Sequence, residues 1–337
     1  MSDDPKSSES SLESHPEAHL TPIAADPALY DTDSNDYDMN ETFSVTSSVF
    51  EFRCENGRTY HRYKDGAYVL PNDEAEKDRL DAIHHLYLVL LDGKLCLAPI
   101  ESPKRILDVG TGTGIWAIEM ADAYTEATVI GTDLSPIQPE WVPENCMFEI
   151  DDAESEWTYP PDHFDFIHSR HLAQSIKDWD LYASQLFRHT KPGGYVELAE
   201  HDYTLYSDDG TYRPGLALYR YMSLISEAAL TAGFSDIAPR MGRLLQGAGF
   251  VDVKIAVKKL PWAPWAQDEK LKELGYWSLL GLSNVAFEAF GMALFTRYHN
   301  FKPDEVKELC EAARKDVWDK RVHAYHLHYV VTARKPE

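Results

Sequence analysis

The sequence has no run of 18 apolar residues and no apolar segment of signal-peptide type behind its first residues, so we expect neither a membrane span nor a secretory leader. Cysteine is scarce: Cys54, Cys96, Cys146 and Cys310 are widely spaced and form neither a C-x-x-C motif nor a Cys/His zinc pattern. We expect inert thiols in a reducing compartment, and the sequence predicts no metal site. It contains no internal repeat.

Positive charge is also in short supply, and the formal net charge is −24 at pH 7. Residues 1–40 hold ten acidic residues and one lysine, Lys6. Such a balance argues against direct binding to nucleic acid or to an anionic membrane. The tail has no basic run that would serve as a nuclear-import signal. We therefore expect a cytoplasmic protein, with a nuclear location as the alternative.

Large apolar residues are sparse at the start of the chain, where Ser, Asp, Glu and Pro dominate. This composition predicts a disordered acidic tail over residues 1–43. The whole chain is 44% hydrophobic and 12% aromatic, which is enough for a sizeable core. We predict one elaborated domain over residues 44–337, with an N-terminal extension over 44–103 and a helical insertion over 261–322.

The most informative stretch is residues 104–114, KRILDVGTGTG. The apolar run Ile106–Val109 predicts a buried parallel strand, glycines follow at alternate positions, and residues 115–124 have helical periodicity. A strand, a glycine turn and a helix in this order open a nucleotide-binding α/β unit. Glycine is needed there because the backbone turns tightly and a ligand approaches it closely.

The spacing of these glycines narrows the choice of nucleotide. Gly110, Gly112 and Gly114 form G-x-G-x-G, one residue shorter than the dinucleotide fingerprint, and Ile115 stands where that fingerprint has its last glycine. No Lys-Ser/Thr pair follows, which excludes a P-loop. An NAD-dependent oxidoreductase is therefore disfavoured but remains an alternative, as does a glycine turn without a ligand.

The rest of the chain alternates between strand and helix patterns, which predicts an α/β fold with a mostly parallel sheet covered by helices. Ligands of such sheets bind at the carboxyl ends of the strands. Residues 267–320 are helix-rich and aromatic, and they form either a lid over the cleft, plain core or a dimer face. Expected strands lie at 104–109, 128–133, 146–151, 164–169, 193–200, 250–260 and 323–334, and expected helices at 74–92, 115–124, 178–190, 213–232 and 238–248.

Polar residues stand at the carboxyl ends of the expected strands. Asp133 is placed to accept hydrogen bonds from both ribose hydroxyls, although an NAD site would need the same acid. Asp151 and Asp152 form either an adenine-binding turn or a solvated acidic turn. The next two strand ends carry the polar residues His168, Ser169, Arg170, His171, Glu197, Glu200 and His201.

Together these stretches resemble the ordered motifs of class I S-adenosylmethionine (AdoMet) methyltransferases: LDVGTGTG, GTDLS, the DDA turn, FDFIHSR and KPGGYVEL. Longer stretches, such as GTGIWAIEMAD and FEIDDAESEWTYP, resemble the fungal secondary-metabolism methyltransferases, including the LaeA-type regulators. The likeness covers about residues 45–335. It implies a Rossmann-like sheet with an antiparallel last strand and AdoMet as cofactor. The cofactor residues that it implies are Asp108, Gly110, Thr111, Gly112, Gly114, Asp133, Leu134, Asp151, Asp152, Ala153 and Ser169.

The resemblance implies methyl transfer to a small-molecule acceptor of secondary metabolism. Its alternative is a regulator that acts through velvet-type protein partners. Because the sulfonium methyl is already activated, the enzyme mainly positions the acceptor, and a hydroxyl acceptor also needs a base. The candidate bases are His168, His171 and His201, unless they are structural, and His168, His201 and Arg170 make up the predicted catalytic set. Arg170 is expected to pair with an acidic substrate or with the cofactor carboxylate, unless it forms an ordinary salt bridge.

Overall fold

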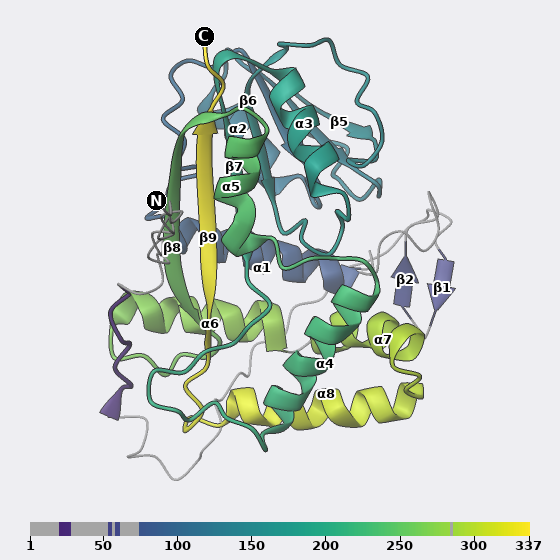
Figure 1. The fold of residues 1–337 in the computed structure, drawn as a ribbon, viewed down its shortest axis with the longest axis vertical. Coiled ribbons are helices and arrows are strands. Elements are labelled where there is room, and N and C mark those ends of the chain that lie inside the picture. Colours follow the sequence, from purple (N-terminus) through teal and green to yellow (C-terminus); the bar gives the residue numbers. More distant parts are fainter. Residues whose placement is uncertain (1–19, 28–52, 56–57, 61–73, 284–285) are drawn as a thin grey trace, which may run out of the picture.

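The computed structural model describes residues 20–27, 53–55, 58–60, 74–283 and 286–337. These residues form a seven-stranded sheet with helices on both faces and, apart from it, a two-stranded antiparallel pair (Figure 1). The expected turn at Asp65–Gly66 and the helix caps expected at Asn72 or Asp73 lie outside the described residues.

The large sheet has the strand order β5-β4-β3-β6-β7-β9-β8. Strand β9 runs antiparallel to both of its neighbours, and the pairs among β3 to β7 are parallel, which confirms a mostly parallel sheet with an antiparallel last strand. The strands are β1 (Arg53–Glu55), β2 (Arg58–Tyr60), β3 (Arg105–Val109), β4 (Thr128–Asp133), β5 (Cys146–Ile150), β6 (Phe164–Arg170), β7 (Thr190–His201), β8 (Val251–Pro261) and β9 (Tyr325–Arg334).

Strand β7 begins three residues before the expected 193, because Thr190 already pairs with Phe164 and an irregularity in register follows. The helices fall where periodicity places them, and the proline-rich connection over residues 134–145 has no helix. The helices are α1 (Glu74–Leu90), α2 (Ile115–Ala123), α3 (Trp179–His189), α4 (Ala217–Thr231), the 3₁₀ turn η3 (Ala238–Arg240), α5 (Met241–Gly247), α6 (Glu269–Ser283), α7 (Ala286–Tyr298) and α8 (Pro303–Trp318).

Neighbouring residues of β3 serve opposite faces of the sheet, as strand geometry requires. Ile106 packs with Trp116 of α2 on one face. Leu107 joins the main core with Tyr182 of α3 on the other face. Because both faces are buried, the strand reads in the sequence as a continuous apolar run.

Helices α6, α7 and α8 lie between β8 and β9, where the insertion over residues 261–322 is expected. Figure 1 shows α4, α7 and α8 gathered beyond one end of the sheet, and they pack on one another. Leu279, Phe287 and Phe295 are almost fully buried, so most of this aromatic segment is core. Phe290 of α7 also faces the cleft described below.

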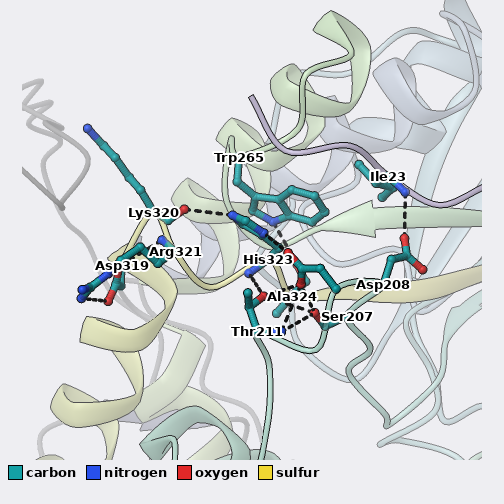
Figure 2. Close-up of polar contacts among 11 residues, drawn as sticks. Ile23, Ser207, Asp208, Thr211, Trp265, Asp319, Lys320, Arg321, His323 and Ala324 are labelled. Carbon is teal, nitrogen blue, oxygen red and sulfur yellow. Dashed lines mark hydrogen bonds and ion pairs between the residues drawn. The ribbon is translucent and has the colours of Figure 1, made fainter. Parts of the chain in front are cut away.

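Residues 20–27 lie within the tail that we expect to be disordered, yet they pack on the insertion. Ala25 forms a bridge with Ala266, and the Ile23 amide donates to Asp208 Oδ2 at 2.7 Å (Figure 2). The expectation of disorder is therefore wrong for these residues. Leu20 and Ile23 pack against the core. A prediction from the average composition of the tail does not reveal two such contacts.

The end of the insertion is held by polar contacts to the loop after β7 (Figure 2). The His323 amide donates to Thr211 Oγ1 at 2.9 Å, and His323 Nδ1 lies 2.5 Å from Asp209 Oδ2. Trp265 Nε1 donates to the Ala324 carbonyl at 3.2 Å. These contacts fix the start of β9 relative to the loop after β7 and to the segment that follows β8.

In the described part of the chain, no single helix is long and apolar enough to cross a membrane. The bent pair α6–α7 meets the length and composition test only when the two helices are counted together.

Candidate active site

A cleft lies at the carboxyl ends of β3, β4, β5, β6 and β7. This is where a parallel sheet of this type binds its ligands. Arg79, Leu80 and Ile83 of α1 and Phe290 of α7 line another part of its wall. The structure brings together in this cleft most of the predicted site residues: Gly110, Thr111, Gly112, Asp133, Leu134, Asp151, Asp152, Ala153, Arg170 and His201.

The glycine loop is held in a conformation that side chains would disrupt. Gly110 and Gly114 have φ values of 71° and 82°, in the left-handed region that glycine tolerates best. A Cβ on Gly110 would lie 2.4 Å from Leu172, and one on Gly114 would lie 2.3 Å from Phe148. Gly114 therefore serves the packing of the loop and does not line the cleft. A Cβ on Gly112 meets only Leu80, at 3.4 Å.

Asp133, at the end of β4, fastens this loop. Its Oδ2 accepts the Gly112 amide at 2.8 Å, and its Oδ1 accepts the Ser135 amide at 2.9 Å. Burial raises the pKa of the Asp133 carboxyl to about 6 despite these hydrogen bonds. Each carboxylate oxygen can accept a further hydrogen bond, so Asp133 keeps acceptor capacity for a diol.

The acidic turn after β5 is ordered by its own carboxylates. Asp152 is 8% exposed and accepts the Glu154 amide and the Ser155 hydroxyl, both at 3.0 Å. Asp151 Oδ1 accepts the Asp152 amide at 2.8 Å. With Ala153 and Leu134, the turn closes the end of the cleft beyond β4.

Asp108 and His168 do not line this cleft, although we expected cofactor contact from the first and catalysis from the second. His168 Nδ1 lies 2.8 Å from Asp108 Oδ1, and Thr111 Oγ1 donates to Asp108 Oδ2 at 2.6 Å. The His168 ring stacks on Trp116 with a centroid separation of 3.8 Å. Burial lowers the pKa of His168, while Asp108 opposes that shift. The pair is a buried support of the glycine loop.

Ser169 is also outside the cleft. It lies in the sheet beside Val109 and Leu198 and is 1% exposed. The sequence predicted it as a cofactor residue because it stands near a strand end. Successive side chains of a strand point to opposite faces of the sheet, so Ser169 and Arg170, the last two residues of β6, point in opposite directions. Of these two residues, Arg170 lines the cleft.

Arg170 joins three elements at the end of β6. Its Nη2 donates to His84 Nδ1 of α1 at 2.9 Å, and its guanidinium lies over the Tyr87 ring at 5.2 Å from the ring centroid. His84 Nε2 lies 3.0 Å from Glu119 Oε2 of α2. Burial, and then Arg170, lower the pKa of His84 to about 3, so the imidazole is neutral and accepts from the guanidinium.

At the far end of the cleft, several polar atoms have no hydrogen-bond partner among the described residues. They are Glu200 Oε2, His201 Nδ1, His171 Nε2 and Gln174 Oε1, all on residues that line the cleft. Glu200 is 1% exposed, its Oε1 accepts the Leu172 amide at 2.5 Å, and burial raises its pKa to about 8. Burial, and then Arg79, lower the pKa of His201 to about 4.

Behind this end lies a cluster of neutral imidazoles. The His201 ring centroid is 4.6 Å from that of His326 and 5.5 Å from that of His328, and His171 is 5.2 Å from His201. Burial lowers the pKa of His326 and His328 well below its usual value. Within the described ranges, no group of three or more His, Cys, Asp or Glu side chains is arranged to bind a metal ion.

The predicted site residues do not include four cleft residues that carry no local motif. Arg79, Leu80 and Ile83 reach the site because α1 crosses it, and Phe290 reaches it from a segment dominated by core residues. Glu200 is among the polar residues noted at a strand end but is not one of the predicted site residues; it lies in β7 next to His201 and lines the cleft.

Comparison with known proteins agrees with this architecture. Residues 82–255 match the methyltransferase domain family. The chain is 42% identical over 312 residues to the methyltransferase pytC of Aspergillus terreus, covering 91% of this chain and 94% of that one. It is 40% identical over 292 residues to the secondary metabolism regulator LAE1 of Cochliobolus heterostrophus, covering 84% and 94%. It is 34% identical over 318 residues to the protein-methionine methyltransferase laeA of Emericella nidulans, covering 93% and 84%. The chain therefore belongs to the family of AdoMet-dependent methyltransferases that includes these LaeA-type and pytC proteins of fungi.

Proposed function

We propose that this chain transfers the methyl group of AdoMet to a small-molecule acceptor of secondary metabolism bound in the same cleft. The observation that carries the proposal is the continuity of the cleft, which runs from the Asp151–Asp152 turn to Glu200 and His201. Donor and acceptor would then bind side by side in one cleft. Apolar side chains such as Ile83 and Phe290 suit an organic acceptor better than an extended protein segment.

The cofactor fits the end of the cleft that holds the glycine loop. Asp133 would accept from the ribose hydroxyls, and the Asp151–Asp152 turn would accept from the adenine amino group. Leu134 and Ala153 offer apolar contacts beside the adenine ring. The space beside Gly112 is open except toward Leu80, so it leaves room for the cofactor. When bound, AdoMet supplies an electrophilic methyl group.

The chain's own residues hold the acceptor in line and manage its proton. Orientation of this kind lowers the activation free energy by up to about 7–11 kcal/mol in favourable cases. His201 lines the cleft as a neutral imidazole with a nitrogen open to the proton of a hydroxyl group, and its lowered pKa makes it a weak base in the free protein. Glu200 stands next to it with an oxygen that lacks a partner. We retain His201 as the candidate base, and Asp108 and His168 act through the loop they support.

The experiment uses AdoMet with a labelled methyl group, incubated with the full chain plus a small-molecule extract or a protein extract of the host. We expect label in a small molecule, identified by the mass of the methylated product. His201→Asn should reduce that labelling and leave AdoMet binding unchanged. Label only in protein would contradict a small-molecule acceptor.

The second candidate function is regulation, because relatives carry the names secondary metabolism regulator and protein-methionine methyltransferase. A regulator of this kind would act with velvet-type proteins. A stable complex with such a protein, without small-molecule turnover, would favour this alternative. Microscopy of the tagged chain would show whether it is cytoplasmic, as we propose, or nuclear.

A further inference from the structure

Arg170 is a cation of the cleft that lacks a carboxylate partner. In the described part of the chain, no carboxylate oxygen lies within 4.0 Å of its guanidinium. Its side chain makes one hydrogen bond, to the neutral His84, and rests on the Tyr87 ring. A guanidinium has five N–H donors, so most of its hydrogen-bonding capacity is unused.

Arg170 is partly buried in the wall of the cleft. Burial lowers the pKa of its guanidinium, and the nearest acids, led by Asp108, act on it only from a distance. A charge that is partly removed from water is stabilised by an anionic partner. Its position therefore calls for an anion supplied from the cleft, and a planar carboxylate matches the fork of an arginine.

Arg79 lines the same cleft and, unlike Arg170, has a carboxylate partner. Its Nη2 lies 2.7 Å from Glu76 Oε1, and its Nε donates to Glu76 Oε2 at 3.0 Å. Glu76 is 1% exposed. The charge of Arg79 is thus neutralised within α1, whereas that of Arg170 is not.

Strand order places Arg170 at one end of the cofactor region. Asp151 follows β5, Asp133 ends β4, the glycine loop follows β3 and Arg170 ends β6, in the order of the strands across the sheet. AdoMet carries its adenine, ribose, sulfonium and amino-acid groups in the same succession. Two strand spacings, about 10 Å, separate β4 from β6. With the adenine at β5, the amino-acid end reaches β6.

We propose that Arg170 binds the carboxylate of AdoMet, and that His84 positions the guanidinium for that contact. The inference rests on the proposed function, because it takes the placement of the adenine end from it. His84 accepts from Arg170 and faces Glu119 with its other nitrogen, so α1 and α2 fix the direction of the fork. The same helix brings Leu80 and Ile83 to the cleft. Cofactor binding thereby holds α1 against the site.

The test is calorimetric titration of the full chain with AdoMet and with decarboxylated AdoMet, which keeps the sulfonium and the amine. We expect the wild type to bind the decarboxylated compound about 10- to 100-fold more weakly. Arg170→Met should lose a similar factor for AdoMet and show no further loss for the analogue. Arg170→Lys should recover part of the affinity, because it keeps the charge and loses the fork.

Equal affinities of the wild type for the two compounds would overturn the assignment, and so would an unchanged ratio in Arg170→Met. A wild type that binds neither compound would contradict the proposed function itself. Thermal unfolding gives a second readout without a ligand. Because the unpaired charge is removed, Arg170→Met should unfold at the same or a higher temperature than the wild type, and AdoMet should stabilise it less. If Arg170→Met does not fold, the affinities of the wild type and of Arg170→Lys for AdoMet and for decarboxylated AdoMet still test the assignment.

Discussion

The two ends of the cleft differ in how their polar groups are satisfied. At the end with the glycine loop, Asp133 and Asp152 already accept backbone amides. At the other end, Glu200 and His201 keep buried polar atoms without a partner. The first end is built by the chain alone before any ligand arrives. In the function that we propose, the ligand completes the second end, and acceptor choice resides there.

The largest effect is expected from a side chain in the preorganised end. Gly110→Ala puts a Cβ 2.4 Å from Leu172 and places alanine at a positive φ. We expect loss of AdoMet binding by more than about 100-fold, since a packed loop shifts to relieve the overlap. Gly210→Ala is the matched control, because Gly210 has a φ of 73° and nothing within 4 Å of its Cβ. Titration calorimetry compares the two, and equal affinities would contradict the role of the loop.

His168→Phe tests the support beneath the loop. The change leaves Asp108 buried with one partner fewer, and we expect a loss of about 1–3 kcal/mol in the free energy of unfolding. Urea denaturation measures it. Adding Asp108→Asn should restore part of the loss, because the uncompensated carboxylate is gone. If His168→Phe instead abolished turnover and left stability unchanged, His168 would be catalytic after all.

The pKa of Asp133, about 6, predicts how AdoMet affinity depends on pH. Below that value the carboxyl gains a proton and cannot accept from both ribose hydroxyls. The affinity should therefore fall by up to about tenfold per pH unit below pH 6. Asp133→Asn should bind AdoMet weakly at every pH and show no such slope, measured by titration from pH 5 to 7.5. Asp151→Asn should keep the slope.

The smallest effect concerns the end that is completed by the ligand. Glu200 has a raised pKa of about 8, so the folded chain holds a proton that an unfolded carboxyl loses near pH 4.3. The contribution of Glu200 to the free energy of unfolding is fully present at low pH and is lost as the pH rises through 8. Between pH 7 and 8 the loss is about 1 kcal/mol. Glu200→Gln should remove it, which chemical denaturation at both pH values would detect, and an identical pH dependence would place the proton elsewhere.

Local sequence accounted for much of the fold. The strands β3 to β6 and the helices α2 and α3 lie within two residues of their predicted bounds, because each has an apolar run or helical periodicity of its own. The glycine loop, Asp133 and the Asp151–Asp152 turn were found for the same reason, since their chemistry resides in contiguous residues. Residues 20–27 were misjudged because their few apolar contacts lie far away in the chain.

The sequence by itself determined the sheet, the nucleotide loop and the strand ends where polar groups stand, because periodicity and motif spacing are local properties. Only the tertiary structure decided which side chains at those ends face the cleft. It turned His168 toward Asp108 and away from the cleft, and it brought α1 beside Arg170. It also left Glu200 without a full set of partners. These outcomes depend on the face of each strand and on contacts between distant segments, which no local pattern encodes.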